Sequence, residues 1–164
     1  MRSTPTASAS QATRNNCYGL LHQLLADEKH IGLLRFFKHE EAGVKDLTKR
    51  IAAISGAGAK LLEKFASRDP SIRLDDIGLP LGEIATREAI ASTKQKELLG
   101  QKGDAFELSL LLTQAEALSY GWHLAKVASE LDTNPERARA MAGLSTDLRS
   151  LYYEVIGLMR SMAK

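Results

Sequence analysis

Three side chains in this 164-residue chain are candidates for holding a divalent metal ion: Glu28, Glu116 and His123. Glu28 lies four residues after Leu24 and three before Ile31, so on a helix it shares their apolar face. A carboxylate on a face that points to the core needs a metal ion, a hydrogen-bond network or access to solvent. The sequence therefore raises a question about what Glu28 contacts.

Di-iron helical bundles take a Glu from two helices and a Glu-x-x-His pair from each of the other two. No Glu-x-x-His occurs in this chain. Glu28 and His30 would point about 200 degrees apart on a helix, and Glu116 and His123 would be roughly 10 Å apart along one. These spacings argue against a di-iron centre. They leave open a single divalent ion, or a structural Glu28 paired with a cation or a hydroxyl group.

Other catalytic motifs are missing. The sequence has no dinucleotide-binding or phosphate-binding glycine loop and no nucleophile elbow. Its one dense small-residue segment, Ser55-Gly56-Ala57-Gly58, falls inside an expected helix, where it favours close helix packing. We therefore expect no catalytic residue, no organic cofactor and no enzymatic activity.

The composition limits the classes of partner that we expect for this chain. The 22 basic and 20 acidic residues give a net charge of +2 and are interspersed, which argues against a nucleic-acid partner. No run of about 18 apolar residues is long enough to span a bilayer. The single cysteine excludes an internal disulfide.

The first stretch differs from the rest. Residues 1–14 are rich in Ser, Thr and Ala and have no apolar period, so we expect a flexible lead. They lack the apolar region of a secretory signal. Residues 15–164 are expected to fold as one domain.

Apolar spacing predicts four long helices, near 15–40, 44–67, 83–131 with a break at 100–103, and 135–162. Residues 70–82, with two prolines and two glycines, are expected to form a long crossover loop. Two helices carry apolar residues separated alternately by three and four, typical of bundle helices. In the second helix these are Val44, Leu47, Ile51, Ile54, Gly58, Leu61 and Phe65, and in the last Met141, Leu144, Leu148, Leu151, Val155, Leu158 and Met162.

The segment 106–127 is apolar on two faces, which indicates a central helix or a contact between copies. We therefore expect a homodimer formed through this segment. Overall, the sequence predicts an all-α protein, an up-down four-helix bundle with one long crossover between its second and third helices, a connectivity found in ferritin-like folds.

Short motifs over residues 28–159 resemble a ferritin-like bacterial family of unknown function, often secreted or periplasmic. Glu28 precedes Val44-Lys45-Asp46-Leu47 at the family's spacing. Leu98, Gly103, Phe106 and Glu107 are similar to the pattern that opens its third long helix. The resemblance implies a ferritin-like fold and a secreted or periplasmic location.

The chain departs from that family at its inward histidines. Where the family has Asp-His-like pairs on the second and third helices, this sequence has Ile54-Ser55 and Ala117-Leu118. The resemblance then implies a degenerate metal centre that retains Glu28.

Two functions from different classes follow. The first is a non-enzymatic interaction or structural protein that forms a homodimer and binds a further, unidentified protein. The alternative is a divalent-metal-binding or stress-related protein that uses Glu28, Glu116 and His123.

Overall fold

The computed structural model describes residues 7–30 and 41–164, which form five α-helices and no strand in these ranges. The helices are α1 (Ala7–Glu28), α2 (Ala42–Arg68), α3 (Leu81–Gly100), α4 (Gly103–Leu131) and α5 (Pro135–Met162). The all-α prediction is confirmed.

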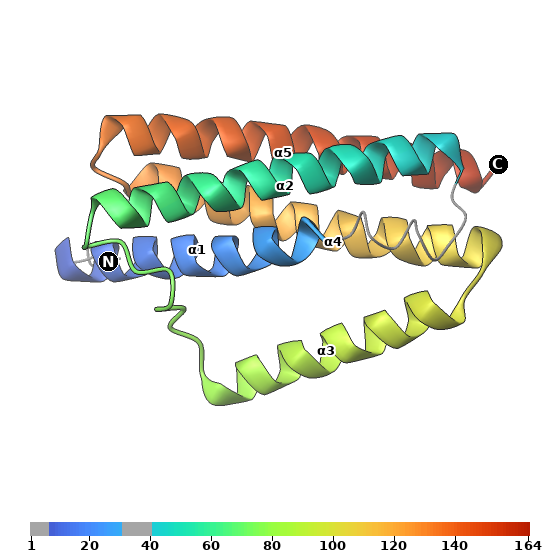
Figure 1. Ribbon diagram of the computed structural model, residues 1–164, viewed down its shortest axis with the longest axis horizontal. Coiled ribbons are helices and arrows are strands. Elements are labelled where there is room, and N and C mark those ends of the chain that lie inside the picture. The colour runs from blue at the N-terminus through green and yellow to red at the C-terminus, as the bar shows by residue number, and fades with distance from the viewer. Residues whose placement is uncertain (1–6, 31–40) are drawn as a thin grey trace, which may run out of the picture.

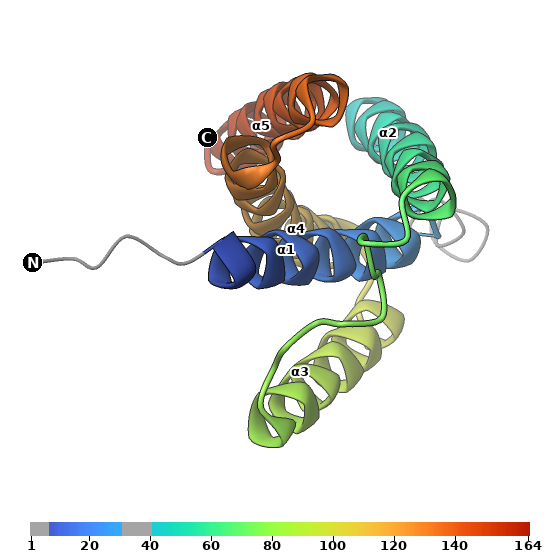
Figure 2. The same ribbon diagram turned by 90° about the vertical axis from the view of Figure 1, so that its left-hand side faces the viewer.

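Four of the helices, α1, α2, α4 and α5, surround a common core, and we call them the core helices (Figure 1, Figure 2). Each contacts two others, in the order α1, α2, α5, α4 and back to α1. Neighbours in this ring run antiparallel, so α4 runs in the same direction as α2. The chain between them, including α3, is therefore a long crossover along the outside.

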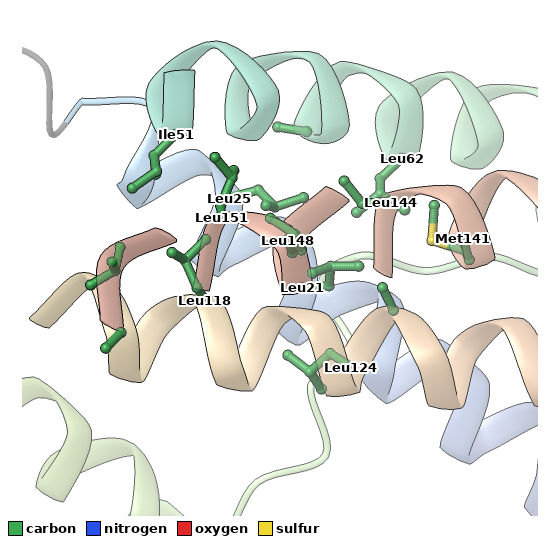
Figure 3. Packing of buried hydrophobic residues seen from close by; sticks show 14 of the residues in the cluster. Leu21, Leu25, Ile51, Leu62, Leu118, Leu124, Met141, Leu144, Leu148 and Leu151 are labelled. Atoms are coloured by element: carbon green, nitrogen blue, oxygen red, sulfur yellow. The ribbon is translucent and has the colours of Figure 1, made fainter. Parts of the chain in front are cut away.

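Leucines from all four core helices meet in the interior (Figure 3). Two glycines let the helices approach closely. A Cβ on Gly58 would lie 2.9 Å from Leu25 Cδ1, and one on Gly121 would lie 2.9 Å from Leu24 Cδ2. The expected close-packing role of the small residues in α2 is confirmed at Gly58.

The apolar spacing of α5 is confirmed from Met141 to Val155, all of whose expected residues are buried. In α2 the spacing drifts. Ile54 and Leu61 are only partly buried, and Ser55 and Leu62 lie in the core in their place. A straight helix with 3.6 residues per turn rotates away from a seven-residue repeat, which accounts for the shift.

The predicted third bundle helix, 83–131 with a break at 100–103, does not pack as one element of the bundle. It is two helices, separated at the expected break, where Gly103 has a φ of +59°. The first part, α3, diverges from the core helices (Figure 1) and buries one apolar side chain, Leu98. Glu88 and Gln95 are seven residues apart and so share one face of α3, and neither can be buried without a partner.

The N-terminal prediction is also corrected. α1 begins at Ala7 and Arg14 is already buried, so residues 7–14 belong to a helix of the core and not to a flexible lead. Two ranges lie outside the described residues, 1–6 and 31–40. They include the rest of the expected lead and the last ten residues of the expected helix 15–40.

Helix starts follow local chemistry. The Asn134 side chain accepts a hydrogen bond from the Arg137 backbone N–H, and Pro135 occupies the first helical position of α5. The N-cap of α5 is thus Asn134. In the described ranges, no helix combines the length and apolar character needed to cross a membrane.

Candidate functional site

Glu28 lies at the end of α1 and faces α4. Its Oε2 atom is buried, and so is the entire side chain of Gln114 on α4. Neither Oε2 nor the two amide atoms of Gln114 make a well-aligned hydrogen bond to a described residue. We call this pair the Glu28–Gln114 centre. It answers the question raised by the sequence: among the described residues, this carboxylate interacts with a buried amide but makes no well-aligned hydrogen bond to it.

The environment of Glu28 favours its neutral form. Burial raises the pKa of Glu28 to about 7, and the negative charge of Asp27 adds to the rise. The Gln114 amide and the Lys94 ammonium group oppose it. Two carboxylates also stand in the last turn of α1, where the helix dipole disfavours negative charge.

Glu107, two turns before Gln114 on α4, is a second buried carboxylate. Its Oε1 accepts a hydrogen bond from the backbone N–H of Glu41 at 2.5 Å. Glu41 is the N-cap residue of α2. Glu107 therefore connects α4 to the start of α2 and has a structural partner.

The predicted metal ligands are not brought together. Glu116 is exposed and pairs with Lys94 of α3, and His123 is exposed, with Nδ1 2.6 Å from the Ser119 carbonyl oxygen. Within residues 7–30 and 41–164, no three His, Cys, Asp or Glu side chains are close enough to hold a metal ion. The ligand set of Glu28, Glu116 and His123 is thus not assembled, because Glu28 points into the core and the other two lie on the surface.

Large apolar side chains are exposed on α3, where Leu81 is 85% exposed, and also on α4 and α5. Leu108 is 47% exposed, Leu112 50% and Tyr153 55%. Leu108 and Leu112 line hollows that they share with α5 residues, and the Tyr153 ring lies 6.3 Å from the Trp122 ring of α4. We call this surface the α4–α5 face.

Two adjoining hollows run along the α4–α5 face. One, of about 480 Å³, lies near the start of α4 and is lined by Asp104, Leu108 and Met162. The other, of about 560 Å³, is lined by Leu112, Ala115, Ser119, Tyr152 and Ile156. Met159 lines both. The two hollows therefore meet at Met159 and form a groove along the face that apolar and polar side chains line.

Aromatic side chains flank the far end of this groove. The Trp122 ring is stacked on His123 at 4.2 Å and lies 5.7 Å from the Tyr152 ring and 6.3 Å from Tyr153. The Arg149 guanidinium lies 5.5 Å from the centre of the Trp122 ring, a cation–π geometry. Trp, Tyr and Arg dominate the binding energy of protein interfaces.

A polar cluster that the sequence did not reveal lies at the turn between α4 and α5. Asp132, at the turn between α4 and α5, accepts hydrogen bonds from Tyr18 Oη at 2.5 Å and from Arg137 Nε at 2.8 Å. Arg137 also pairs with Asp69 at the end of α2 at 2.9 Å. We call these four residues the Asp132 cluster. It connects α1, α2 and α5 at one turn.

Hydrogen bonds set the protonation of the Asp132 cluster, in which one guanidinium pairs with two carboxylates. Burial alone would raise the pKa of Asp132, but hydrogen bonds from Arg137 and Tyr18 hold it below its usual value. Burial, together with the hydrogen bond to Asp132, raises the pKa of the Tyr18 hydroxyl. The cluster is therefore a fully paired network of the kind that specifies a unique arrangement.

The Asp132 cluster left little signal in the sequence. Tyr18 and Asp132 are 114 positions apart, and no spacing rule relates them. The exposed leucines of α4 did leave a signal in the sequence, because the helix is apolar on two faces.

Comparison with protein-family models, with curated proteins and with solved structures finds no match to this chain.

Proposed function

We propose that this chain is a non-enzymatic, ferritin-like helical protein that acts by binding protein, with a second copy of itself as a partner. The observation that carries the proposal is the α4–α5 face, where half-exposed leucines border an aromatic cluster. Contiguous apolar surface rimmed by polar groups marks interaction sites in proteins. The face combines a groove with aromatic and arginine anchors.

The burial pattern of α4 supports this proposal. α4 contacts α1, α3 and α5, yet Leu108 and Leu112 remain about half exposed. A helix that stays apolar on the side left open by its own fold is suited to contact another molecule. The sequence prediction of a homodimer through 106–127 and the position of the groove thus agree on one surface.

The ferritin-like part of the proposal is supported by connectivity. Ferritin-like folds contain one antiparallel helix pair, then a long crossover, then a second antiparallel pair. The core helices follow this order, with α1 and α2 as the first pair and α4 and α5 as the second (Figure 1). The helix α3 occupies the crossover. The Glu28–Gln114 centre lies where such folds carry polar groups, in contact between two core helices.

Metal binding remains the rival function, and elemental analysis separates the two. Protein purified without chelator should carry no stoichiometric iron, manganese or zinc. About one ion per chain that disappears in Glu28→Ala would contradict the proposal and favour the rival. Metal at the same background level in both proteins would support the interaction function.

The direct test is the oligomeric state, measured by light scattering and sedimentation velocity over a wide concentration range. We expect a dimer that Leu112→Glu dissociates, because a carboxylate on the groove floor would be buried in the interface. Leu81→Glu is the matched control, since Leu81 is 85% exposed on α3, outside the face. A wild-type monomer at all concentrations would contradict the proposal.

A further inference from the structure

We propose that the two copies meet α4 against α4 in antiparallel orientation, with the two-fold axis beside Ala115. The acidic end of the α4–α5 face in one copy then contacts the arginine-bearing end in the other. This inference rests on the self-association proposed above and adds the orientation and the residues that specify it.

The acidic end lies at the start of α4. Asp104 and Glu41 are exposed there, and both line the hollow that also contains Leu108. Within the described residues, neither carboxylate has a cation within ion-pair distance. This end of the face therefore presents negative charge beside an apolar floor.

The basic end lies toward the end of α4. Arg149 covers the aromatic rings and, like Asp104, has no ion-pair partner in the described part of the chain. Lys126 makes a single solvent-exposed contact, 3.9 Å from Glu130. Asp104 and Trp122 are roughly 27 Å apart along α4, well beyond the Debye length of about 8 Å. The two ends therefore cannot neutralise each other within one copy.

The positions on α4 suit a two-fold axis at Ala115. In the sequence Ala115 is midway between Leu108 and Trp122, and also midway between Asp104 and Lys126. An antiparallel pair centred there places each leucine against the partner's tryptophan and each aspartate against the partner's lysine, with Arg149 nearby. A C2 interface requires this kind of self-complementary surface.

The shape of the groove agrees with this axis. Ala115 and Ser119 are small and line the central hollow, whereas Leu112 projects from it half-exposed. Across an axis at Ala115, Leu112 of one copy lies one position out of register with Ser119 of the other, close enough for the two side chains to meet. A parallel arrangement would instead place each Asp104 beside the Asp104 of the other copy and each Arg149 beside the other Arg149. Like charges would then repel.

Charge reversal tests the orientation. Asp104→Lys and Arg149→Asp should each weaken the dimer, raising Kd at least about tenfold, and the double variant should return Kd to within about threefold of wild type. Glu88→Lys on α3 and Lys60→Asp on α2 are the controls, since both positions are exposed and outside the face. They should leave Kd unchanged.

A cysteine experiment gives a second measurement that does not depend on charge. In a Cys17→Ala background, protein with Leu112→Cys is mixed with protein with Ser119→Cys under oxidising conditions. The antiparallel pair predicts that the mixture forms a disulfide-linked dimer faster than either variant alone.

The outcomes separate the two proposals. A wild-type dimer that is insensitive to both charge reversals, or cysteine variants that link to themselves faster than to each other, would overturn the orientation and leave self-association standing. A wild-type monomer at every concentration would overturn both.

Discussion

Two buried polar regions of this protein differ in how they are satisfied. In the Asp132 cluster, Asp132 accepts hydrogen bonds from Tyr18, from Arg137 and from the backbone N–H of Asn134. At the Glu28–Gln114 centre, three buried polar atoms have no well-aligned partner among the described residues. The first region joins α1, α2 and α5 at the turn between α4 and α5, whereas the second joins only α1 and α4.

This difference indicates where stability and function lie. A paired buried network stabilises one arrangement, and breaking it leaves an isolated buried charge. A buried centre without well-aligned hydrogen bonds loses the hydration of its polar groups and gains little hydrogen-bond energy in exchange. We therefore assign stability at the α4–α5 turn to the Asp132 cluster and interaction to the α4–α5 face, and we assign neither to the Glu28–Gln114 centre.

The largest expected effect comes from breaking the paired region. Asp132→Ala removes the acceptor of Tyr18 and leaves Arg137 with Asp69 as its remaining carboxylate, so the free energy of unfolding should fall by about 3 kcal/mol. Urea denaturation measures it, with Asp147→Ala on the exposed side of α5 as control. A loss below about 1 kcal/mol would show that the cluster does not hold the turn.

The two regions should respond oppositely to pH. The folded protein holds the Glu28 proton up to about pH 7, whereas the unfolded chain releases it near pH 4.5. Stability attributable to Glu28 is therefore full at low pH and is lost as pH rises from 4.5 to 7, by up to about 3 kcal/mol. Asp132 has a lowered pKa, so its contribution is present above its unfolded pKa and is lost as pH falls.

The measurement is urea denaturation of wild type and Glu28→Gln at several pH values between 4 and 8. The difference in the free energy of unfolding should change across this interval because the amide does not titrate. A difference that is constant with pH would contradict the assigned environment of Glu28.

Replacing the unpaired centre should stabilise the protein. Glu28→Leu combined with Gln114→Leu exchanges polar groups without partners for apolar groups of similar size, and should raise the free energy of unfolding by about 1–2 kcal/mol. Thermal and urea denaturation at pH 7 measure the change. Destabilisation by a similar amount would mean that the centre is better satisfied than its contacts indicate.

The smallest expected effect comes from removing a single hydrogen bond of the Asp132 cluster. Tyr18→Phe deletes one donor to Asp132 and leaves Arg137 and the Asn134 N–H in place. The free energy of unfolding should fall by about 1 kcal/mol. A loss as large as that of Asp132→Ala would place the tyrosine, and not the arginine, at the centre of the cluster.

Much of the fold could be predicted because it depends on local apolar spacing. The α5 residues Met141 and Leu148 follow their pattern, and the break before Gly103 follows from glycine chemistry. The separation of α3 from the core was harder to foresee, although Glu88 and Gln95 on its stripe were a sign of it. The break at 100–103 was expected, but the apolar pattern on its two sides did not show that the chain reverses direction there.

The sites were less predictable because they depend on contacts between distant segments. Glu28 was identified as an inward carboxylate from its place on a leucine stripe, and burial of its Oε2 confirms that. Its partner Gln114 carries no distinctive spacing. Glu116 and His123 share an outer surface of α4, and only the packing of α1 shows that Glu28 points elsewhere.

The most direct test of the function compares the surface with the buried centre in one experiment. Sedimentation velocity would measure Kd for self-association of wild type, Leu112→Glu and the Glu28→Leu/Gln114→Leu double variant. We predict that Leu112→Glu raises Kd at least about tenfold, while the double variant stays within about threefold of wild type. A dimer that survives Leu112→Glu and is lost in the double variant would contradict the assignment of interaction to the α4–α5 face.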